Sequence, residues 1–162
     1  MDLKNSPLFR GFSQEALDEI RHHLKPRHYR PDECICRQGE PGDSLFLIRN
    51  GLVEIIMQRS DSPVLLDRLR RGDILGEMAL LTGEPRTASA VAAVSTEVLE
   101  LRRAAFAAII ARYPKVLFNI SQTLIERYKR NQIFLSQHRK RGEAVAVVMG
   151  RHACVHIANA IA

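Results

Sequence analysis

Short apolar runs alternate with turn residues through the middle of the chain. Between Tyr29 and about Leu101 the runs are separated by segments rich in Gly, Pro, Asp and Ser, and they read ECICR, SLFLIR, LVEIIMQ, VLLDRL, ASAVAAV and EVLELR. Runs of this length and spacing predict the strands of an antiparallel sandwich or barrel. Asn50-Gly51, which separates two of these runs, predicts a two-residue hairpin with a type I′ turn.

Helical spacing occurs on both sides of this region. "FSQEALDEIRHHL" contains Ser13, a good N-cap, followed by apolar residues at intervals of three and four. The alanine-rich "RAAFAAIIARY" must end before Pro114, because proline disfavours helical backbone at the preceding residue. A longer helix is expected from Pro114 to about His138, with this stripe of residues: Leu117, Ile120, Leu124, Tyr128, Asn131 and Leu135. The predicted fold is mainly β, a jelly-roll-like barrel or sandwich with flanking α-helices.

The end of the chain has a different pattern. A basic cluster, HRKR, precedes the apolar run Ala144–Met149, a glycine and a helix-like run. A strand, a glycine and a helix begin an α/β unit, but a lone strand needs neighbours in its sheet. We therefore expect residues 1–138 to form one domain. Residues 139–162 are expected to be a basic linker and the start of a truncated α/β domain.

Composition and charge narrow the class of protein. The chain has 162 residues, 46% of them hydrophobic, and a formal net charge of +6, which suits one folded domain with an anionic partner. Three irregularly spaced cysteines favour a reducing, cytoplasmic setting. The six histidines show no paired ligand motif, so no metal site is expected. No apolar run is long enough to predict a membrane span.

One segment, GDILGEMALLTGEPRTASA at 72–90, sets charged residues among small and apolar ones. Glu77 follows a glycine, and Arg86 stands nine residues later. A guanidinium offers a planar set of donors to phosphate oxygens, whereas an ionised carboxylate accepts hydrogen bonds from sugar hydroxyls. "EMALL" predicts a short helical turn whose free N–H groups would add to anion binding. These features predict a sugar-phosphate site; the alternative is a surface ion pair between Glu77 and Arg86.

The same residues resemble a known family. GEMALLTGEPRTAS, from Gly76 to Ser89, is similar to the phosphate-binding cassette of the cyclic nucleotide-binding domain family, Gly-Glu-x-Ala-Leu, a short gap, then Pro-Arg-x-Ala-Ser or Thr. Upstream, GEPGDSLFLIRNGLVEI resembles the glycine-rich hairpin of that family, and Leu101, Phe106 and Pro114 match its closing helix pattern. The resemblance covers roughly residues 7 to 135.

The resemblance implies roles for individual residues. Glu77 would accept a hydrogen bond from the ribose 2′-hydroxyl, Arg86 would pair with the exocyclic oxygens of the cyclic phosphate, and Thr87 would contact the phosphate or the base. The other cassette residues expected at the ligand are Gly76, Met78, Ala79 and Ala88. The helix after Pro114 would act as a lid over the base. The lid candidates, each of which could instead belong to a solvated helix face, are Arg127, Tyr128, Arg130 and Asn131.

The function implied is that of a regulatory sensor without catalysis or cofactor. It would bind a 3′,5′-cyclic nucleotide, with cyclic AMP favoured over cyclic GMP because the composition, rich in Ala and Arg, looks bacterial. The lid helix would relay occupancy to an output domain of the same full-length chain and would also form a homodimer. Any catalytic domain would lie beyond Ala162.

Two alternatives remain from the sequence. The first is the effector domain of a transcription regulator fragment, although residues 142–162 lack the two helices of a helix-turn-helix, so no direct DNA binding is expected from them. The second is a degenerate interaction module of the same fold that binds no nucleotide. The presence of both Glu77 and Arg86 argues against this second alternative.

Overall fold

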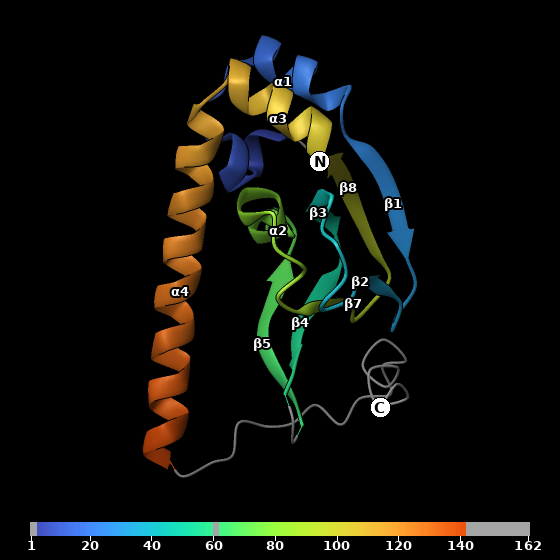
Figure 1. Ribbon diagram of the computed structural model, residues 1–162. Helices are drawn as coiled ribbons and strands as arrows, with labels where there is room; N and C mark the ends of the chain where they lie inside the picture. Colours follow the sequence, from blue (N-terminus) through green and yellow to red (C-terminus); the bar gives the residue numbers. More distant parts are fainter. Residues whose placement is uncertain (1–2, 60–61, 142–162) are drawn as a thin grey trace.

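Two antiparallel sheets and a set of flanking helices make up the molecule. The computed structural model describes residues 3–59 and 62–141, with side chains as far as Arg130. The sheets form a sandwich, α1 and α3 lie together at one end, and α4 runs along one side (Figure 1). This arrangement confirms the predicted jelly-roll-like sandwich with flanking helices.

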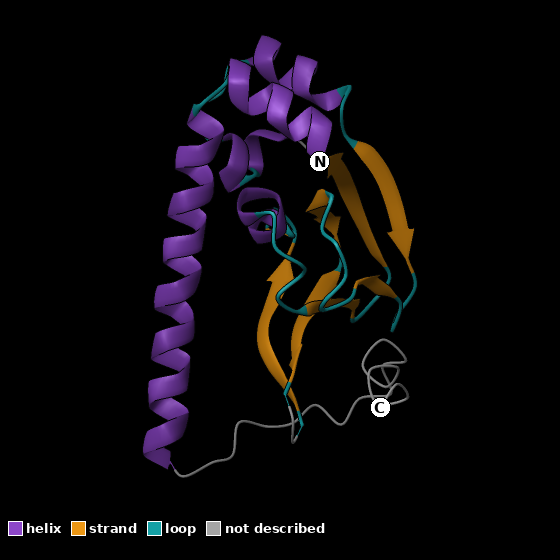
Figure 2. Cartoon of the chain, viewed as in Figure 1, coloured by secondary structure: helices purple, strands orange, loops and turns teal. Residues whose placement is uncertain are grey.

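Each sheet has four strands, and most neighbours within a sheet are far apart in the sequence. The first, in spatial order, consists of β1 (Lys25–Tyr29), β8 (Thr96–Arg102), β3 (Ser44–Asn50) and β6 (Ile74–Leu75). The second consists of β2 (Cys34–Cys36), β7 (Ser89–Ala92), β4 (Leu52–Gln58) and β5 (Pro63–Arg70). All pairings are antiparallel, and Figure 2 shows the strands grouped together, with helices above them and along one side. Six of the eight strands coincide with the predicted apolar runs; β1 and β6 were not predicted.

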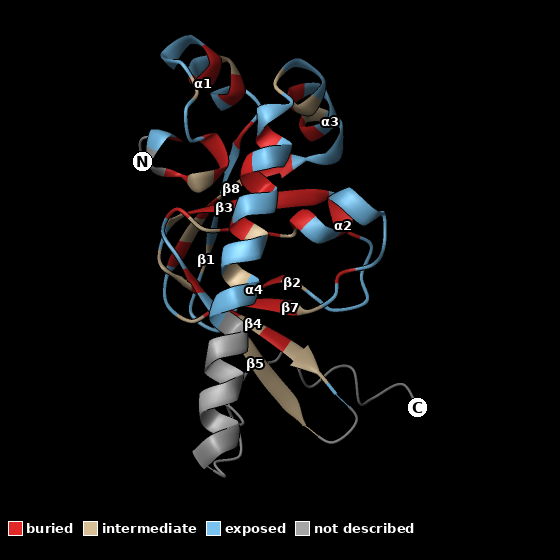
Figure 3. Cartoon of the chain, turned by 90° about the vertical axis from the view of Figure 1, so that its left-hand side faces the viewer, coloured by how far each residue is buried: buried red, intermediate tan, exposed pale blue. Residues whose placement is uncertain are grey.

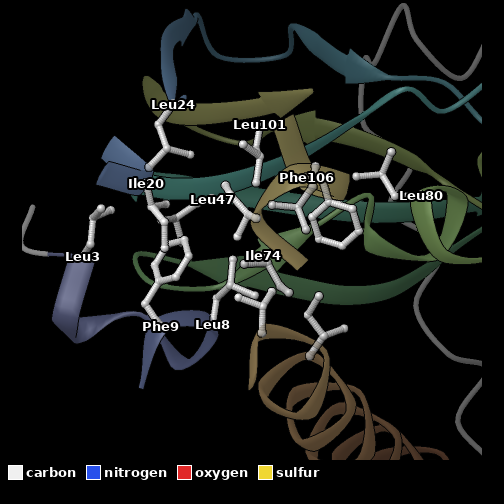
Figure 4. Packing of buried hydrophobic residues seen from close by; sticks show 14 of the residues in the cluster. Leu3, Leu8, Phe9, Ile20, Leu24, Leu47, Ile74, Leu80, Leu101 and Phe106 are labelled. Carbon is white, nitrogen blue, oxygen red and sulfur yellow. The ribbon is translucent and has the colours of Figure 1, made fainter. Parts of the chain in front are cut away.

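Strand β3 is buried on both of its faces, which explains why its sequence, SLFLIR, does not alternate. Leu45 and Leu47 belong to a core between the first sheet and the helices. Phe46 and Ile48 belong to a second core between the two sheets. Figure 4 shows the first core, in which side chains from the helices meet Leu47 and Ile74 of the sheet. The two cores together fix the position of β3 in the middle of the molecule.

The helices precede and follow the strands, apart from one short helix between them. Ser13 caps α1 (Gln14–Arg21) as predicted, because its hydroxyl accepts a hydrogen bond from the N–H of Ala16 at 3.3 Å. The other helices are η1 (Leu3–Asn5), η2 (Pro7–Phe9), α2 (Glu77–Thr82), α3 (Arg103–Arg112) and α4 (Lys115–Arg141). No helix within the described residues is long and apolar enough to cross a membrane.

Helix α4 packs against the domain with a face that includes Ile120 and Leu124 of the predicted stripe but differs from the stripe at other positions. Val116 and Ile120 are buried, and Asn119 donates hydrogen bonds from Nδ2 to the carbonyls of Leu8 at 2.9 Å and Arg10 at 3.2 Å. Two members of the predicted stripe are exposed instead, Leu117 by 39% and Tyr128 by 66%. The side chains of Asn131 and Leu135 lie outside the described residues. Figure 3 shows the alternation of buried and exposed residues along α4.

The predicted hairpin at Asn50-Gly51 is wrong. Strand β3 belongs to the first sheet and β4 to the second, so the two residues connect the sheets and do not turn one strand back on the other. Only Gly51 has a positive φ, +105°, whereas a type I′ turn needs two such residues. A Cβ at Gly51 would lie 2.7 Å from the Thr96 Cα, so this glycine is required by the close passage of β8.

Candidate functional site

A cavity of about 200 Å³ lies where α2, the second sheet and α4 meet. Eight predicted site residues line it: Gly76, Glu77, Met78, Ala79, Arg86, Thr87, Ala88 and Arg127. The remaining lining residues were not predicted: Cys36, Ile55, Leu66, Asp67, Leu75, Ala90 and Leu124. The structure thus brings the cassette and two residues of the predicted lid helix, Leu124 and Arg127, to one place.

Arg86 is buried, with 6% of its surface exposed, and neutral carbonyl groups hold it. Its Nη1 donates to the carbonyl of Gly76 at 3.0 Å, and its Nη2 donates to the carbonyl of Ser44 at 2.7 Å. The guanidinium also lies over the ring of Phe46, 5.7 Å from the ring centre. No carboxylate forms an ion pair with Arg86 among the described residues. Its positive charge is therefore available to an anion in the cavity.

The turn before α2 allows Arg86 to approach the backbone closely. Gly76 has a φ of +84°, and a Cβ there would lie 2.3 Å from the Nη1 of Arg86 and 2.9 Å from the carbonyl oxygen of Ser44. Only glycine satisfies both the left-handed conformation and this contact. The glycine at the start of the cassette therefore positions the arginine ten residues later.

The upstream glycine-rich segment lies beside the cassette. The N–H of Gly39 donates to the carbonyl of Arg86 at 2.8 Å, and the N–H of Arg86 donates to the carbonyl of Glu40 at 2.8 Å. Gly42 packs so closely that a Cβ would lie 2.3 Å from the Cβ of Ala79. These contacts explain why the two segments of the family resemblance occur together in the sequence, since each holds the other in place.

Glu77 is almost fully buried, with 3% of its surface exposed, and only one of its oxygens is satisfied. Oε1 accepts a hydrogen bond from Nη1 of Arg127 at 3.1 Å. Oε2 is buried and accepts no hydrogen bond from the described residues. A buried carboxylate oxygen without a donor costs free energy, so this atom favours a ligand that brings a hydroxyl group.

Arg127 connects α4 to both sides of the cavity. In addition to Glu77, it donates from Nη2 to the carbonyl of Ile74 at 2.7 Å, and its Nε lies 3.7 Å from Oδ2 of Asp67 on β5. Arg130 reaches the same Asp67 oxygen at 3.1 Å. Asp67 was not predicted, because its place at the cavity depends on the approach of α4 to β5. Four charged groups thus hold the helix against the sheet.

The other lid candidates have different positions. Arg130 contacts Asp67 but does not line the cavity, and Tyr128 is 66% exposed. The side chain of Asn131 lies outside the described residues. Leu124, one turn before Tyr128, lines the cavity instead. The lid face of α4 is therefore formed by Leu124 and Arg127, three residues apart.

Two further features complete the chemistry of the cavity. Burial raises the pKa of the Cys36 thiol, although the nearby Arg86 guanidinium acts in the opposite direction. The thiol is therefore protonated at neutral pH and contributes a small apolar surface. Within the described part of the chain, no group of three or more His, Cys, Asp or Glu side chains could hold a metal ion.

Comparison with known proteins agrees with this geometry. The family model of the cyclic nucleotide-binding domain matches residues 26–113, and the chain belongs to this family. The match includes the cassette, the glycine-rich segment and both sheets apart from the start of β1. The domain is regulatory in character.

Relatives differ in what accompanies the domain. A cyclic nucleotide-gated potassium channel of Rhizobium etli is 37% identical over 121 residues, which are 75% of this chain and 33% of the channel. A cyclic AMP receptor protein of Thermus thermophilus is 34% identical over 134 residues, which are 82% of this chain and 62% of the receptor. The crystal structure of the Thermus thermophilus catabolite activator protein has a TM-score of 0.73 at 34% identity, over 82% of this chain and 62% of that chain. The chain spans less than two thirds of these relatives.

Proposed function

We propose that this chain is a sensor that binds a 3′,5′-cyclic nucleotide, with cyclic AMP favoured over cyclic GMP, and that α4 relays its occupancy. One observation supports this proposal above the others. The unsatisfied Oε2 of Glu77 and the guanidinium of Arg86, which has no carboxylate partner among the described residues, line the same cavity. A cyclic nucleotide carries a partner for each group: its ribose hydroxyl can donate a hydrogen bond to Oε2 of Glu77, and its singly charged phosphate diester can pair with the guanidinium of Arg86.

The phosphate end of the ligand would lie against Arg86. Two of its donors already hold carbonyl groups, and a guanidinium has five, so donors remain for the exocyclic phosphate oxygens. The adjacent Gly76, Met78, Ala79 and Ala88 would contribute backbone and small apolar surface. The absence of an ion pair means that the ligand would not have to displace a protein carboxylate.

The ribose end would lie against Glu77. Its Oε2 would accept a hydrogen bond from the 2′-hydroxyl, while Oε1 would keep its contact with Arg127. Ligand and lid would therefore share one carboxylate without competing for the same oxygen. This arrangement makes the position of α4 sensitive to the ribose, and it is the physical basis of the proposed relay.

The test of the ribose contact is a comparison of cyclic AMP with its 2′-deoxy analogue by calorimetric titration. A hydrogen bond to a buried charged group contributes about 1.5–3 kcal/mol, so the unchanged protein should bind cyclic AMP roughly ten to a hundred times more tightly than the analogue. In Glu77→Gln this difference should shrink, whereas the exposed Glu84→Gln should preserve it. Equal binding of the two ligands by the unchanged protein would contradict the assignment.

The preference for cyclic AMP over cyclic GMP concerns the base of the ligand. Thr87 lines the cavity next to Arg86, where its hydroxyl could meet either purine. The relative named a cyclic AMP receptor protein supports cyclic AMP. Competition between cyclic AMP and cyclic GMP decides the question directly. Tighter binding of cyclic GMP would reverse the preference, and Thr87→Ala would then show whether that hydroxyl causes it.

The relay can be followed with a single fluorescent reporter. The chain contains no tryptophan, so Tyr128→Trp would place one on the exposed side of α4, beside Arg127. Cyclic AMP should change its emission, and 5′-AMP, which carries an open phosphate of higher charge, should not. If cyclic AMP binds without any change in emission, the proposed binding function stands, but the proposed relay through α4 is contradicted.

The degenerate interaction module is the main alternative. It predicts that neither cyclic nucleotide binds to the folded protein. The buried, half-satisfied Glu77 disfavours it, because a site without a ligand has no reason to keep such a group.

The wider organisation of the chain is also a proposal. We infer that an output domain lies in the same full-length chain, since both relatives described above are longer than the matched region. Residues 139–162, predicted to be a basic linker and the start of an α/β domain, would lead into it; helix α4 extends to Arg141, and the remaining residues lie outside the described structure. Sequencing of the gene beyond Ala162 would show whether the output is a helix-turn-helix, as in the transcription-regulator alternative, or another domain.

A homodimer through α4 is proposed on the basis of its outer face. Phe118, Ile125 and Tyr128 are 60%, 46% and 66% exposed and lie seven and three residues apart, a spacing typical of paired helices. Sedimentation velocity should show a dimer that Phe118→Glu converts to a monomer, while Gln122→Glu leaves it unchanged. A monomer in both the unchanged and the altered protein would remove this proposal.

A further inference from the structure

A second arginine, Arg103, holds the opposite end of α2 from Arg127. Its Nη2 donates to the carbonyls of Gly42 at 2.6 Å and Ala79 at 3.0 Å, and its Nη1 donates to the carbonyl of Leu80 at 3.2 Å. Its backbone N–H donates to the carbonyl of Asp43 at 2.7 Å. One side chain therefore joins the start of α3, the helix α2 and the loop before β3.

The chemistry of these contacts is that of a cation at a helix C-terminus. The last carbonyl groups of a helix have no partner within it, and a positive charge is favourable there. Arg103 forms no ion pair with a carboxylate among the described residues, so its guanidinium is committed to carbonyl groups alone. The planar guanidinium donates to α2 and to the loop before β3 at the same time. A lysine could not make the same set of contacts with its single ammonium group.

Both segments that Arg103 joins border the phosphate end of the cavity. A Cβ at Gly42 would lie 2.3 Å from the Cβ of Ala79 and 3.1 Å from Nε of Arg86. A shift of α2 or of this loop would therefore change the surroundings of Arg86. The same shift would pull on α3, because Arg103 is the first residue of that helix.

From α3 the connection continues to α4 with little slack. Only Tyr113 and Pro114 separate the two helices, and the N–H of Val116 donates to the carbonyl of Tyr113 at 3.0 Å. Helix α4 then returns to α2 through Arg127 and Glu77. These three links form a closed ring, α2 to α3 to α4 and back to α2, with an arginine at each of the two links that involve α2.

We propose that Arg103 is a positioning residue that couples the phosphate end of the site to α3 and the first turns of α4. This inference rests on the proposed function, because it concerns what a bound cyclic nucleotide would transmit. The apolar contacts offer a competing route, since Leu80 of α2 and Phe106 of α3 share one core (Figure 4). The experiment must therefore separate the arginine from this packing.

Hydrogen–deuterium exchange with and without saturating cyclic AMP makes this separation. Peptides from α2, from α3 (103–112) and from the first turns of α4 (115–122) are compared; the last two lie away from Arg127. In the unchanged protein cyclic AMP should slow exchange in all three. In Arg103→Gln it should still slow exchange in α2, but its effect on α3 and residues 115–122 should be lost, with binding weakened about tenfold.

The neighbouring Arg102→Gln is the matched control. Its side chain is 60% exposed and, among the described residues, forms an ion pair with Glu100 alone, at 3.7 Å, so the transmitted effect should remain complete. Arg103→Lys keeps the charge but not the fork, and it should restore only part of the effect. If Arg103→Gln does not fold, the partial effect in Arg103→Lys carries the test alone.

The outcomes are distinguishable. If cyclic AMP at saturation still slows exchange in α3 of Arg103→Gln as much as in the unchanged protein, the coupling through Arg103 is overturned and the Leu80–Phe106 packing carries it. If only Arg103→Lys folds, the same result in that variant has the same meaning. A failure of the unchanged protein to bind either cyclic nucleotide would instead overturn the proposed function, and this inference with it.

Discussion

Arg86 and Arg127 line the same cavity, yet the groups around them differ. Carbonyl oxygens and an aromatic ring hold Arg86, whereas the carboxylates of Glu77 and Asp67 lie against Arg127. Neutral partners orient a guanidinium but do not neutralise its positive charge. Acidic partners neutralise the charge, and the arginine then connects two elements of the structure. The contrast indicates that the first arginine serves the ligand and the second serves the helix.

The largest effect is expected from Arg86→Ala. Truncation of one side of a buried charge-assisted pair costs roughly 2–5 kcal/mol, so binding of cyclic AMP should weaken by well over tenfold. Calorimetric titration measures this, and circular dichroism checks that the fold survives. Arg21→Ala, which removes a surface arginine paired with Asp18 at 3.5 Å, is the control. Unchanged affinity in Arg86→Ala would reverse the contrast between the two arginines.

Arg127→Gln should act mainly on the protein without its ligand. It removes the arginine that Glu77 contacts and one of the two arginines that Asp67 contacts, and these two carboxylate side chains are 4% and 12% exposed. We expect the free energy of unfolding to fall by roughly 1–3 kcal/mol, less than for a fully buried pair, because α4 can move and admit water. Urea denaturation measures the change, with the exposed Lys129→Gln as control. An unaltered midpoint would show that Arg127 does not tie α4 to the sheet.

Asp67→Asn should have a smaller effect of the same kind. Arg127 keeps Glu77 and the carbonyl of Ile74, and the contact with Arg130 involves a side chain that is 58% exposed. Exposed ion pairs contribute about 0.2–1 kcal/mol, so the loss of stability should stay within that range and shrink as salt is added. A loss as large as that of Arg127→Gln would mean that β5, not α2, is the main attachment of α4.

The smallest effect concerns the thiol of Cys36, at the Arg86 end of the cavity. Because its pKa is raised by burial, it is less ionised at any given pH than an exposed thiol. Alkylation by iodoacetamide should be slow at pH 7 and should accelerate as the pH rises through a pKa above the ordinary thiol value. Peptide mass spectrometry resolves this residue from the other two cysteines. Saturating cyclic AMP should slow the reaction further, whereas rapid alkylation at neutral pH would contradict the burial.

The cassette could be predicted from sequence because its parts are local. Gly76, Glu77 and Arg86 lie within eleven residues, and the constraints that join them, a left-handed glycine and a short helix, have signals of their own. The cavity residues that β5 contributes, Leu66 and Asp67, could not be predicted. Asp67 stands in a strand with no motif, and its position at the cavity follows only from the way α4 crosses β5.

The errors in the strand pattern have physical causes as well. Asn50-Gly51 carries the residues of a tight turn, but the glycine is needed for the approach of Thr96, and the chain changes sheets there. Strand β1, KPRHY, was missed because four of its five residues are exposed, so it has no apolar period. Local patterns report which residues are buried; they do not report which strand is the neighbour.

Strand β1 also has a consequence for synthesis on the ribosome. Among the described strands its partner is β8, with Lys25 opposite Glu100 and Tyr29 opposite Thr96. The pairing of β1 with β8 must therefore wait until the six strands between them in the sequence have been translated. The sequence of β1 is compatible with this delay. Its proline and its three basic side chains, Lys25, Arg27 and His28, keep this edge soluble and discourage pairing with other nascent chains.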